Sequence, residues 1–461
     1  MEPLRGEEAA SHASTRGPVV SRAVELSTAP PARAVLGAAE APRLFWAAPG
    51  EATVVGSGAA TRVTATGDDR FETVRAAADD LFATGDVHAG TLAARPRLFG
   101  GFAFHDDHGG AEPWGGFPAA GFVLPETQVT YTDDSAWLTV NAAGPEADAE
   151  TVERRIEEAR ERLAGLPDPG PVGPPPGVHS RERTTSRDTW RDSVNAAVSR
   201  INAGELRKVV LAQALRTDLD TPVSVPDVLA RLGETYPDCY RFLVEPTAER
   251  GADSPNVERA ERGFLGATPE RLVALRGRTV ETGALAGTTG RGDTPEEDEW
   301  LARELMDDAK NRHEHELVAD AIREQLDPFA ASVAAGERRV RRLATVQHLE
   351  TPITAELERD EHVLTLVKAL HPTPAVGGLP PNVALESIRE TERFDRGWYA
   401  APVGWFDAAG YGSFAVALRS AVVADAIATL FAGVGIVGDS DPDREWDEVD
   451  LKYRPMLDEL E

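Results

Sequence analysis

Lys208 is the first residue of the run KVVLAQAL, whose β-branched and apolar side chains predict a strand. Most lysines are solvated surface charges, but the start of an apolar strand favours burial of this one. Burial disfavours the charged form of a lysine, so a buried lysine loses its proton more readily than an exposed one. Lys208 is therefore a candidate general base, provided that burial or a nearby cation keeps it neutral.

Glutamate carboxylates are oxygen donors of the kind that bind a divalent cation. Glu314 lies in HEHEL, and Glu445 and Glu448 lie in REWDEVDLK. A spacing of three residues places Glu445 and Glu448 on one face if this segment is helical. Mg²⁺ takes oxygen ligands, often one or two carboxylates together with water and substrate. The chain has 77 acidic residues, most of which we expect to be solvated, so the residue type alone does not single out these three.

Glycine-rich runs could bring backbone N–H groups close to an anion, because glycine has no Cβ. The run GVGIVG, from Gly433 to Gly438, matches a dinucleotide-binding pattern, but turn-forming DSDPD follows it where a helix would be required. GTTGRG (287–292) lacks the Gly-Lys-Ser/Thr ending of a phosphate loop, and HEHEL is not a zinc-protease motif. No Cys/His group has the spacing of zinc ligands. Dinucleotide, nucleotide and zinc sites are therefore not expected.

The elements that must position these residues follow a break in the chain. Residues 166–178 read LPDPGPVGPPPGV, which can continue neither a helix nor a central strand, so we expect a linker over 166–180 between an N-terminal part (1–165) and a catalytic core (181–461). Ser186 can cap a helix that ends near Gly204. One long helix is predicted from about Glu296 to Leu326, and 412–423 is predicted to be a single strand. Many strands with a few long helices, not in strict alternation, predict a mixed α/β fold with large sheets.

Composition indicates an acidic protein of the cytosol. The 461 residues carry a net charge of −29, which repels nucleic acid and anionic membranes, so we expect neither as a partner. The 48 basic residues are 44 arginines and only four lysines, and this pattern is typical of proteins from salt-loving organisms. The single cysteine, Cys239, cannot form an internal disulfide, and MEPLRGEEAASHAS has no apolar stretch that would indicate a signal peptide.

From about Trp190 to the C-terminus the chain resembles the chorismate-utilising enzymes, a family of isochorismate, salicylate, anthranilate and aminodeoxychorismate synthases. RLFGGFAF (97–104), before the linker, is also similar to the family. The resemblance rests on eight blocks in the family's order: KVVLAQ (208–213), GATPERL (266–272), ETGALAGT (281–288), DAKNRHEHELV (308–318), VQHLETPI (346–353), LHPTPAVGG (370–378), RGWYAAPVGW (396–405) and AGVGIVGDSDPDREWDEVDLK (432–452).

The resemblance implies one large α/β (α+β) fold, in which two β-sheets pack as a sandwich with helices outside and the N-terminal part completes the fold. It implies that Lys208 is the base, because this position carries Lys in enzymes that use water and Gln in those that use ammonia. It makes Glu270 the general acid, where the residues alone suggest only a glutamate paired with Arg271. The resemblance implies that Glu314 and Glu448 bind Mg²⁺ directly. It implies that Glu445 either binds the ion through a water molecule or supports the residues that bind it.

The remaining positions that match the family would bind the substrate chorismate, a dianion. Arg419 and Lys452 match the family's anion-binding positions. His348 also matches a family position, although a single histidine in a sequence is more often structural. One departure from the family is Asn311, where related enzymes often have an acidic residue that could strengthen the metal site. The other expected substrate contacts are Gly287, Thr288, Gly433 and Gly435 through the backbone, the hydroxyl of Tyr399, and His348 near the reacting hydroxyl.

Among the family's reactions, water addition is the one expected. Water would attack ring carbon 2 of chorismate while the hydroxyl leaves carbon 4, which requires a base, an acid and Mg²⁺. Lys208 argues against anthranilate synthase component I. Ala375, where lyase members have Thr, argues against salicylate synthase. A non-catalytic chorismate-binding paralogue would lack part of this set. We therefore expect an isochorismate synthase, a monomeric cytoplasmic isomerase without a glutaminase subunit, which serves menaquinone biosynthesis in preference to siderophore biosynthesis.

Overall fold

The computed structural model describes residues 13–14, 18–145, 147–246 and 262–461. Most of the N-terminal segment in which we expected no signal peptide lies outside the described residues. Within these ranges two large sheets account for all the strands, and the strands are antiparallel except where β2 (Val19–Glu25) pairs with β6 (Asp86–His88). The two-sheet α/β fold implied by the sequence is thus confirmed.

The first sheet contains 11 strands of the described chain. They are β1 (Ala13–Ser14), β5 (Thr61–Ala65), β7 (Arg97–Phe102), β8 (Ala120–Leu124), β15 (Arg271–Arg276), β16 (Thr279–Gly290), β17 (Ala330–Ala335), β18 (Arg339–Arg342), β19 (Val346–Leu357), β21 (Pro402–Asp407) and β22 (Gly412–Val416). Their order is β1-β5-β8-β7-β21-β22-β15-β16-β19-β17, and β18 also pairs with β19.

The second sheet contains 13 strands of the described chain. Besides β2 and β6 they are β3 (Leu44–Ala47), β4 (Thr53–Ser57), β9 (Thr127–Tyr131), β10 (Ala136–Ala143), β11 (Val178–Arg183), β12 (Lys208–Leu219), β13 (Tyr240–Val244), β14 (Arg262–Thr268), β20 (Gly378–Leu379), β23 (Ser420–Ala424) and β24 (Ile427–Ile436). Their order is β11-β12-β24-β23-β14-β13-β3-β4-β9-β10-β2-β6, and β20 also pairs with β12. Strands from before and after the proline-rich segment stand side by side in both sheets.

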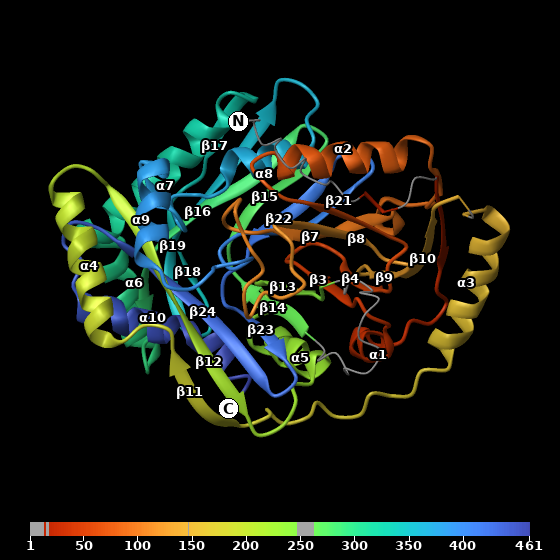
Figure 1. Cartoon of the computed structure of the whole chain (residues 1–461), viewed down its shortest axis with the longest axis horizontal. Helices are drawn as coiled ribbons and strands as arrows, with labels where there is room; N and C mark the ends of the chain where they lie inside the picture. Colours follow the sequence, from red (N-terminus) through yellow and green to blue (C-terminus); the bar gives the residue numbers. More distant parts are fainter. Residues whose placement is uncertain (1–12, 15–17, 146, 247–261) are drawn as a thin grey trace, which may run out of the picture.

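Helices surround the sheets, with α3 and α4 at opposite outer edges (Figure 1). In the described chain they are α1 (Ala32–Ala38), α2 (Arg70–Ala83), α3 (Ala149–Ala164), α4 (Arg187–Asn202), α5 (Val225–Thr235), α6 (Pro295–Asp307), α7 (Ala309–Leu326), α8 (Val363–Leu370), α9 (Pro381–Thr391) and α10 (Pro442–Leu457), with a short 3-10 turn at Leu92–Ala94. As predicted, Ser186 caps α4 by accepting a hydrogen bond from the Thr189 N–H. No helix in the described ranges is long and apolar enough to cross a membrane.

Two predicted elements are each divided in the structure. The helix expected from Glu296 to Leu326 is broken at Asp308, whose extended backbone ends α6 and whose carboxylate caps α7 by accepting from the Asn311 N–H. The strand expected over 412–423 is divided into β22 and β23, which belong to different sheets. Arg419 lies at this division with a φ of 49°. Both predictions were wrong because apolar periodicity does not reveal a local cap or a left-handed residue.

The proline-rich segment runs along the outside of the molecule from α3 to β11 (Figure 1). Regular structure resumes at Val178, inside the range 166–180 that we expected to be a linker, because β11 pairs with β12 from this residue on. Arg33 donates to the carbonyl oxygen of Pro169, and the Gly177 N–H donates to that of Leu460. The segment is therefore hydrogen-bonded to the body of the protein at both of its ends.

Candidate active site

A small cavity of about 70 Å³ brings together residues that are far apart in the sequence. It is bordered by β12 and β24 of the second sheet, by β16 and β19 of the first, and by the helices α7 and α10. Twelve of the thirteen residues predicted for the site line it: Lys208, Glu270, Gly287, Thr288, Glu314, His348, Tyr399, Arg419, Gly433, Gly435, Glu448 and Lys452.

Lys208 begins β12 and is buried, with 1% of its side chain exposed. Its Nζ lies 2.8 Å from Oε1 of Glu314 on α7. Gly435 of β24 makes this approach possible, because a Cβ at that position would lie 2.6 Å from Oε1 of Glu314 and 2.8 Å from Cε of Lys208. The expected burial of Lys208 is present, and its partner is one of the predicted metal ligands.

The other two predicted metal ligands are also paired with lysines. Glu448 lies 2.8 Å from Lys452 Nζ, one turn along α10, and this lysine also donates to the carbonyl oxygen of Gly433 at 2.9 Å. Glu445 lies 3.2 Å from Lys310 Nζ. Each of the three carboxylates is thus paired with a lysine, and two of the three pairs line the cavity.

Glu445 differs from the other two glutamates because it does not line the cavity. Its side chain is only 3% exposed, and burial, together with the nearby charge of Glu448, raises its pKa, while Lys310 acts in the opposite direction. Burial alone would also raise the pKa of Glu314, but Lys208, together with Lys452 and Lys310, outweighs it and holds that pKa below its ordinary value. Glu445 therefore stands behind the cavity and Glu314 faces it as a carboxylate.

Within the described ranges, no three His, Cys, Asp or Glu side chains are grouped closely enough to hold a metal ion by themselves. Glu314 and Glu448, however, present two carboxylates to one cavity that also has room for other oxygen donors. This donor set fits Mg²⁺, which commonly keeps water and takes oxygens from a substrate besides one or two carboxylates. Asn311 does not line this cavity, and its N–H and Nδ2 both donate to Asp308.

Glu270 connects β14 to β15 and is 5% exposed. The hydroxyl of Thr268 accepts from its N–H at 3.3 Å, and its carbonyl oxygen accepts from the Val416 N–H at 3.0 Å, so its backbone is fixed from two sides. Burial raises the pKa of its carboxyl to about 7, against the opposing effects of Lys208, Lys452 and Arg419. A carboxyl that keeps its proton near neutral pH can act as a general acid.

His348 on β19 is held as the neutral Nδ1-protonated form. Arg419 can only donate, so its contact of 3.1 Å makes Nε2 the acceptor, while Nδ1 lies 3.3 Å from the carbonyl oxygen of Gly287 and 3.1 Å from the Thr288 hydroxyl. Burial, reinforced by the charge of Arg419, lowers the pKa of His348 well below its ordinary value. His348 therefore presents no positive charge to the cavity and positions the guanidinium of Arg419.

Unusual backbone conformations at Gly287 and Arg419 help to position the groups around His348. Gly287 has a φ of 78° and forms a bulge between β16 and β19, a conformation that favours glycine. Arg419 adopts a φ of 49° without being glycine, which costs roughly 1–3 kcal/mol. Strained backbone of this kind is concentrated at functional sites, and here it directs a buried guanidinium into the cavity wall.

The N-terminal part of the chain supports one wall of the cavity. Tyr399 stacks on Phe431 with a ring separation of 5.3 Å, and Phe431 stacks in turn on Trp114 at 5.2 Å. Tyr399 and Phe431 line the cavity, whereas Trp114 is fully buried behind them. Sequence reasoning did not identify Phe431, Leu418 or Trp114, because an apolar side chain gives no chemical signal of its own.

A family model described as chorismate binding enzyme matches residues 7–461. The salicylate biosynthesis isochorismate synthase of Pseudomonas aeruginosa is 38% identical over 91% of this chain and 85% of its own length. The isochorismate synthase MenF of Bacillus subtilis is 36% identical over 80% of this chain and 75% of its own length. The structure of MenF, the menaquinone-specific isochorismate synthase from Escherichia coli, superposes with a TM-score of 0.76 at 27% identity, covering 99% of this chain and 96% of that one.

Proposed function

The chain belongs to the chorismate-binding enzyme family, and from that premise we propose that it is an isochorismate synthase, an isomerase that converts chorismate to isochorismate. Both relatives described above and the solved MenF structure carry this activity in their names. The observation that supports it most directly is the presence of a buried lysine and a buried, proton-holding glutamate in one cavity.

The mechanism follows from the two sides of this cavity. Lys208 in its neutral form takes a proton from water, whose oxygen forms the new bond to ring carbon 2. The two ring double bonds each shift by one position, and the bond from carbon 4 to its hydroxyl oxygen breaks. Glu270 gives its proton to that departing oxygen, so the leaving group is water rather than hydroxide. Atoms balance, because one water enters and one leaves.

Substrate charge is balanced by the cations of the site. Arg419 and Lys452 line the cavity and offer fixed donors to the carboxylates of a dianion. Mg²⁺ is part of the proposal, with Glu314 and Glu448 as its protein ligands, and when bound it would hold a substrate carboxylate and draw charge from the ring. Glu445 would act from behind, by keeping Lys310 in place.

The side chain that distinguishes the lyase members is also in the cavity. Ala375 lines the wall where those enzymes have Thr, and a methyl group offers no hydroxyl to support elimination of pyruvate. We therefore propose no lyase activity. For the pathway we propose menaquinone biosynthesis, which the MenF relative supports. The alternative is siderophore biosynthesis, because the Pseudomonas relative is named for salicylate biosynthesis. Restoration of menaquinone in a bacterium that lacks its own enzyme would test this choice.

The activity itself is tested by approaching equilibrium from both sides. Purified protein with Mg²⁺ is incubated with chorismate and, separately, with isochorismate, and the products are resolved by chromatography. We expect the same mixture from either side, without pyruvate, because one allylic C–O bond replaces another and the isomers differ by about a few kcal/mol. Stoichiometric pyruvate with salicylate would identify a salicylate synthase. No conversion at all would favour a non-catalytic chorismate-binding protein.

A further inference from the structure

A second, wider cavity adjoins Glu270 outside the active-site cavity. It measures about 550 Å³ against about 70 Å³ for the active site, and Pro269, Glu270 and Leu285 line both. We call it the outer cavity and define it by its remaining wall, which includes Tyr240, Arg271, Arg341, Val340, Glu350 and Pro352. The three shared residues are thus the partition between the two spaces.

The wall of the outer cavity is polar and held in place by hydrogen bonds. Arg341 donates to the carbonyl oxygen of Pro269 at 2.8 Å and contacts Glu350 at 3.2 Å, which fixes β18 against the partition. Arg271 donates through Nε to the hydroxyl of Tyr240 at 2.5 Å. A space of this volume with charged groups on its wall can hold many water molecules, each of which needs a few polar partners.

Each turnover requires the exchange of a proton and a water molecule at Glu270. In each forward turnover Glu270 loses one proton to the departing hydroxyl, and Lys208 gains one from the attacking water. Before the next turnover Glu270 must regain a proton, and the water formed at carbon 4 must leave. Because Glu270 borders both spaces, exchange through the outer cavity does not require the product to leave the active-site cavity first.

We propose that the outer cavity is the solvent port of Glu270, through which the water formed from the carbon 4 hydroxyl escapes and the carboxyl is reprotonated from solvent. This proposal rests on the proposed function. The escaping water crosses the partition formed by Pro269, Glu270 and Leu285. In the reverse direction the same port supplies the water that attacks carbon 4.

The test uses an isotopic label on the departing oxygen. Chorismate carrying ¹⁸O in the carbon 4 hydroxyl is incubated with the protein in ordinary water, and mass spectrometry follows label loss from chorismate alongside isochorismate formation. In the wild-type protein we expect unlabelled chorismate to appear at least as fast as isochorismate is released, because the departing water exchanges with solvent through the port while isochorismate is still bound, and the reverse reaction then returns an unlabelled oxygen to carbon 4. Chorismate that keeps its label until isochorismate has been released would overturn the proposal, because the water would then leave only with the product.

Two substitutions should plug the port from different walls, at positions that do not line the active-site cavity. Val340→Trp on β18 and Pro352→Trp on β19 both place an indole in the outer cavity. We expect kcat to fall by at least about fivefold with KM for chorismate nearly unchanged, and label exchange in the remaining chorismate to slow with it, because release of a product then limits turnover. Ala334→Trp, at an exposed position of β17 that does not line this cavity, is the matched control and should behave as wild type.

The outcomes separate the two proposals. If both plugged proteins fold, as judged by circular dichroism, and turn over with wild-type kcat and label loss, the port is wrong while the isochorismate synthase assignment stands. If the plugged proteins do not fold, the label balance of the wild-type protein decides. If the wild-type protein does not interconvert the two isomers, the proposed function itself is contradicted.

Discussion

Lys208 and Glu314 form a buried ion pair in which Nζ lies 2.8 Å from Oε1. The candidate base is thus held by a candidate metal ligand, and a base must be free of that partner to accept a proton. Lys310 and Lys452 pair with the two other glutamates of this group, so three of the chain's four lysines are gathered here. In a chain that otherwise uses arginine, lysine is retained where a compact, titratable ammonium is needed.

Replacement of this base provides the first prediction. Lys208→Gln should lower kcat by roughly 10²-fold or more, because an amide cannot accept the proton of the attacking water. The control is Lys368→Gln, since Lys368 is the fourth lysine and pairs with Glu72 on the surface. Steady-state rates of chorismate consumption would show the difference, and a Lys208→Gln protein as active as the Lys368→Gln protein would contradict the role of base.

Removal of the metal gives the second prediction. Activity should disappear with excess chelator and return with Mg²⁺. Among the described residues, the carboxylates that line the cavity are Glu270, Glu314 and Glu448, and the last two are available to bind the ion because Glu270 serves as the acid. Glu448→Gln should raise the Mg²⁺ concentration needed for half-maximal rate by about tenfold or more. Its melting temperature should change little, since the Glu448 side chain is 30% exposed. Full turnover in chelator would rule the metal out.

The chemistry of the site could be predicted from sequence much better than its geometry. The sequence blocks that resemble the family predicted that Lys208, Glu270 and Glu448 belong to one site, and in the structure all three line one cavity. The pairs of Lys208 with Glu314 and of Lys310 with Glu445 were not predicted, because they join β12 to α7 and α7 to α10, and such pairing depends on how distant segments pack. The left-handed backbone at Arg419 was missed for a related reason: only tertiary contacts make such a conformation tolerable in a non-glycine residue.

The general acid should give the pH profile its alkaline limb. Burial raises the pKa of Glu270 to about 7 from an ordinary value of 4.5, so the carboxyl holds its proton below that pH and loses it above. kcat/KM should therefore fall as pH rises through about 7. Glu270→Gln should remove most activity at every pH. A wild-type profile that stays level between about pH 6 and 9 would show that no carboxyl of this kind limits the reaction.

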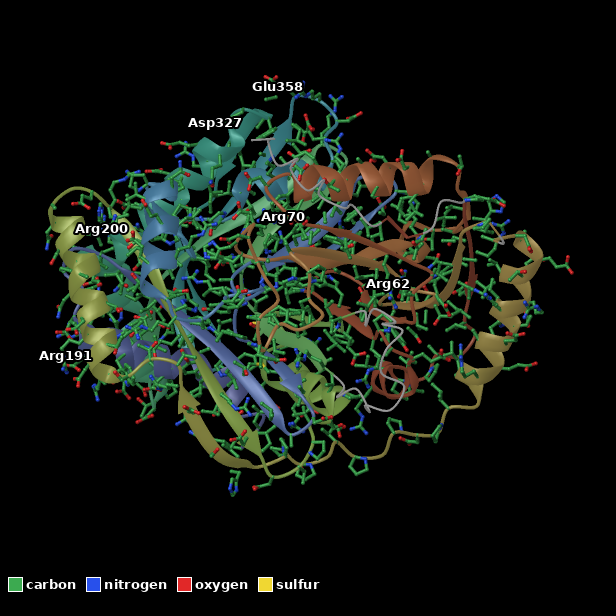
Figure 2. All side chains as sticks on the ribbon, in the orientation of Figure 1. Arg62, Arg70, Arg191, Arg200, Asp327 and Glu358 are labelled. Carbon is green, nitrogen blue, oxygen red and sulfur yellow. The ribbon has the colours of Figure 1, made fainter. Side chains whose placement is uncertain are left out.

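Stability should depend on salt. The net charge of −29 makes the compact state repel itself, and added ions screen this repulsion. Charged side chains cover the outside of the molecule, with Arg191 and Arg200 on α4 at the left of this view and Asp327 and Glu358 at its top (Figure 2). The melting temperature should rise between dilute buffer and about 2 M KCl, as followed by circular dichroism. An unchanged or lower value in salt would show that surface ion pairs outweigh the net repulsion.

Two glycines of β24 should differ sharply in their tolerance of a methyl group. A Cβ at Gly435 would lie 2.6 Å from Glu314 Oε1 and 2.8 Å from Lys208 Cε, so Gly435→Ala must push this pair apart. A Cβ at Gly433 would lie 3.1 Å from the Leu211 carbonyl oxygen and 3.2 Å from the Tyr399 hydroxyl, which a small shift can relieve.

We therefore expect Gly435→Ala to lose about tenfold or more in kcat/KM, because displacement of a reacting group by a fraction of an ångström is enough to misalign it. Gly433→Ala also adds a methyl group to the cavity wall but should lose less activity than Gly435→Ala, and it is the matched comparison because both changes are on the same strand. Thermal unfolding of the two proteins separates loss of alignment from loss of fold. Equal activity in both variants would mean that the Lys208–Glu314 pair can move without consequence, and its position would then have no part in catalysis.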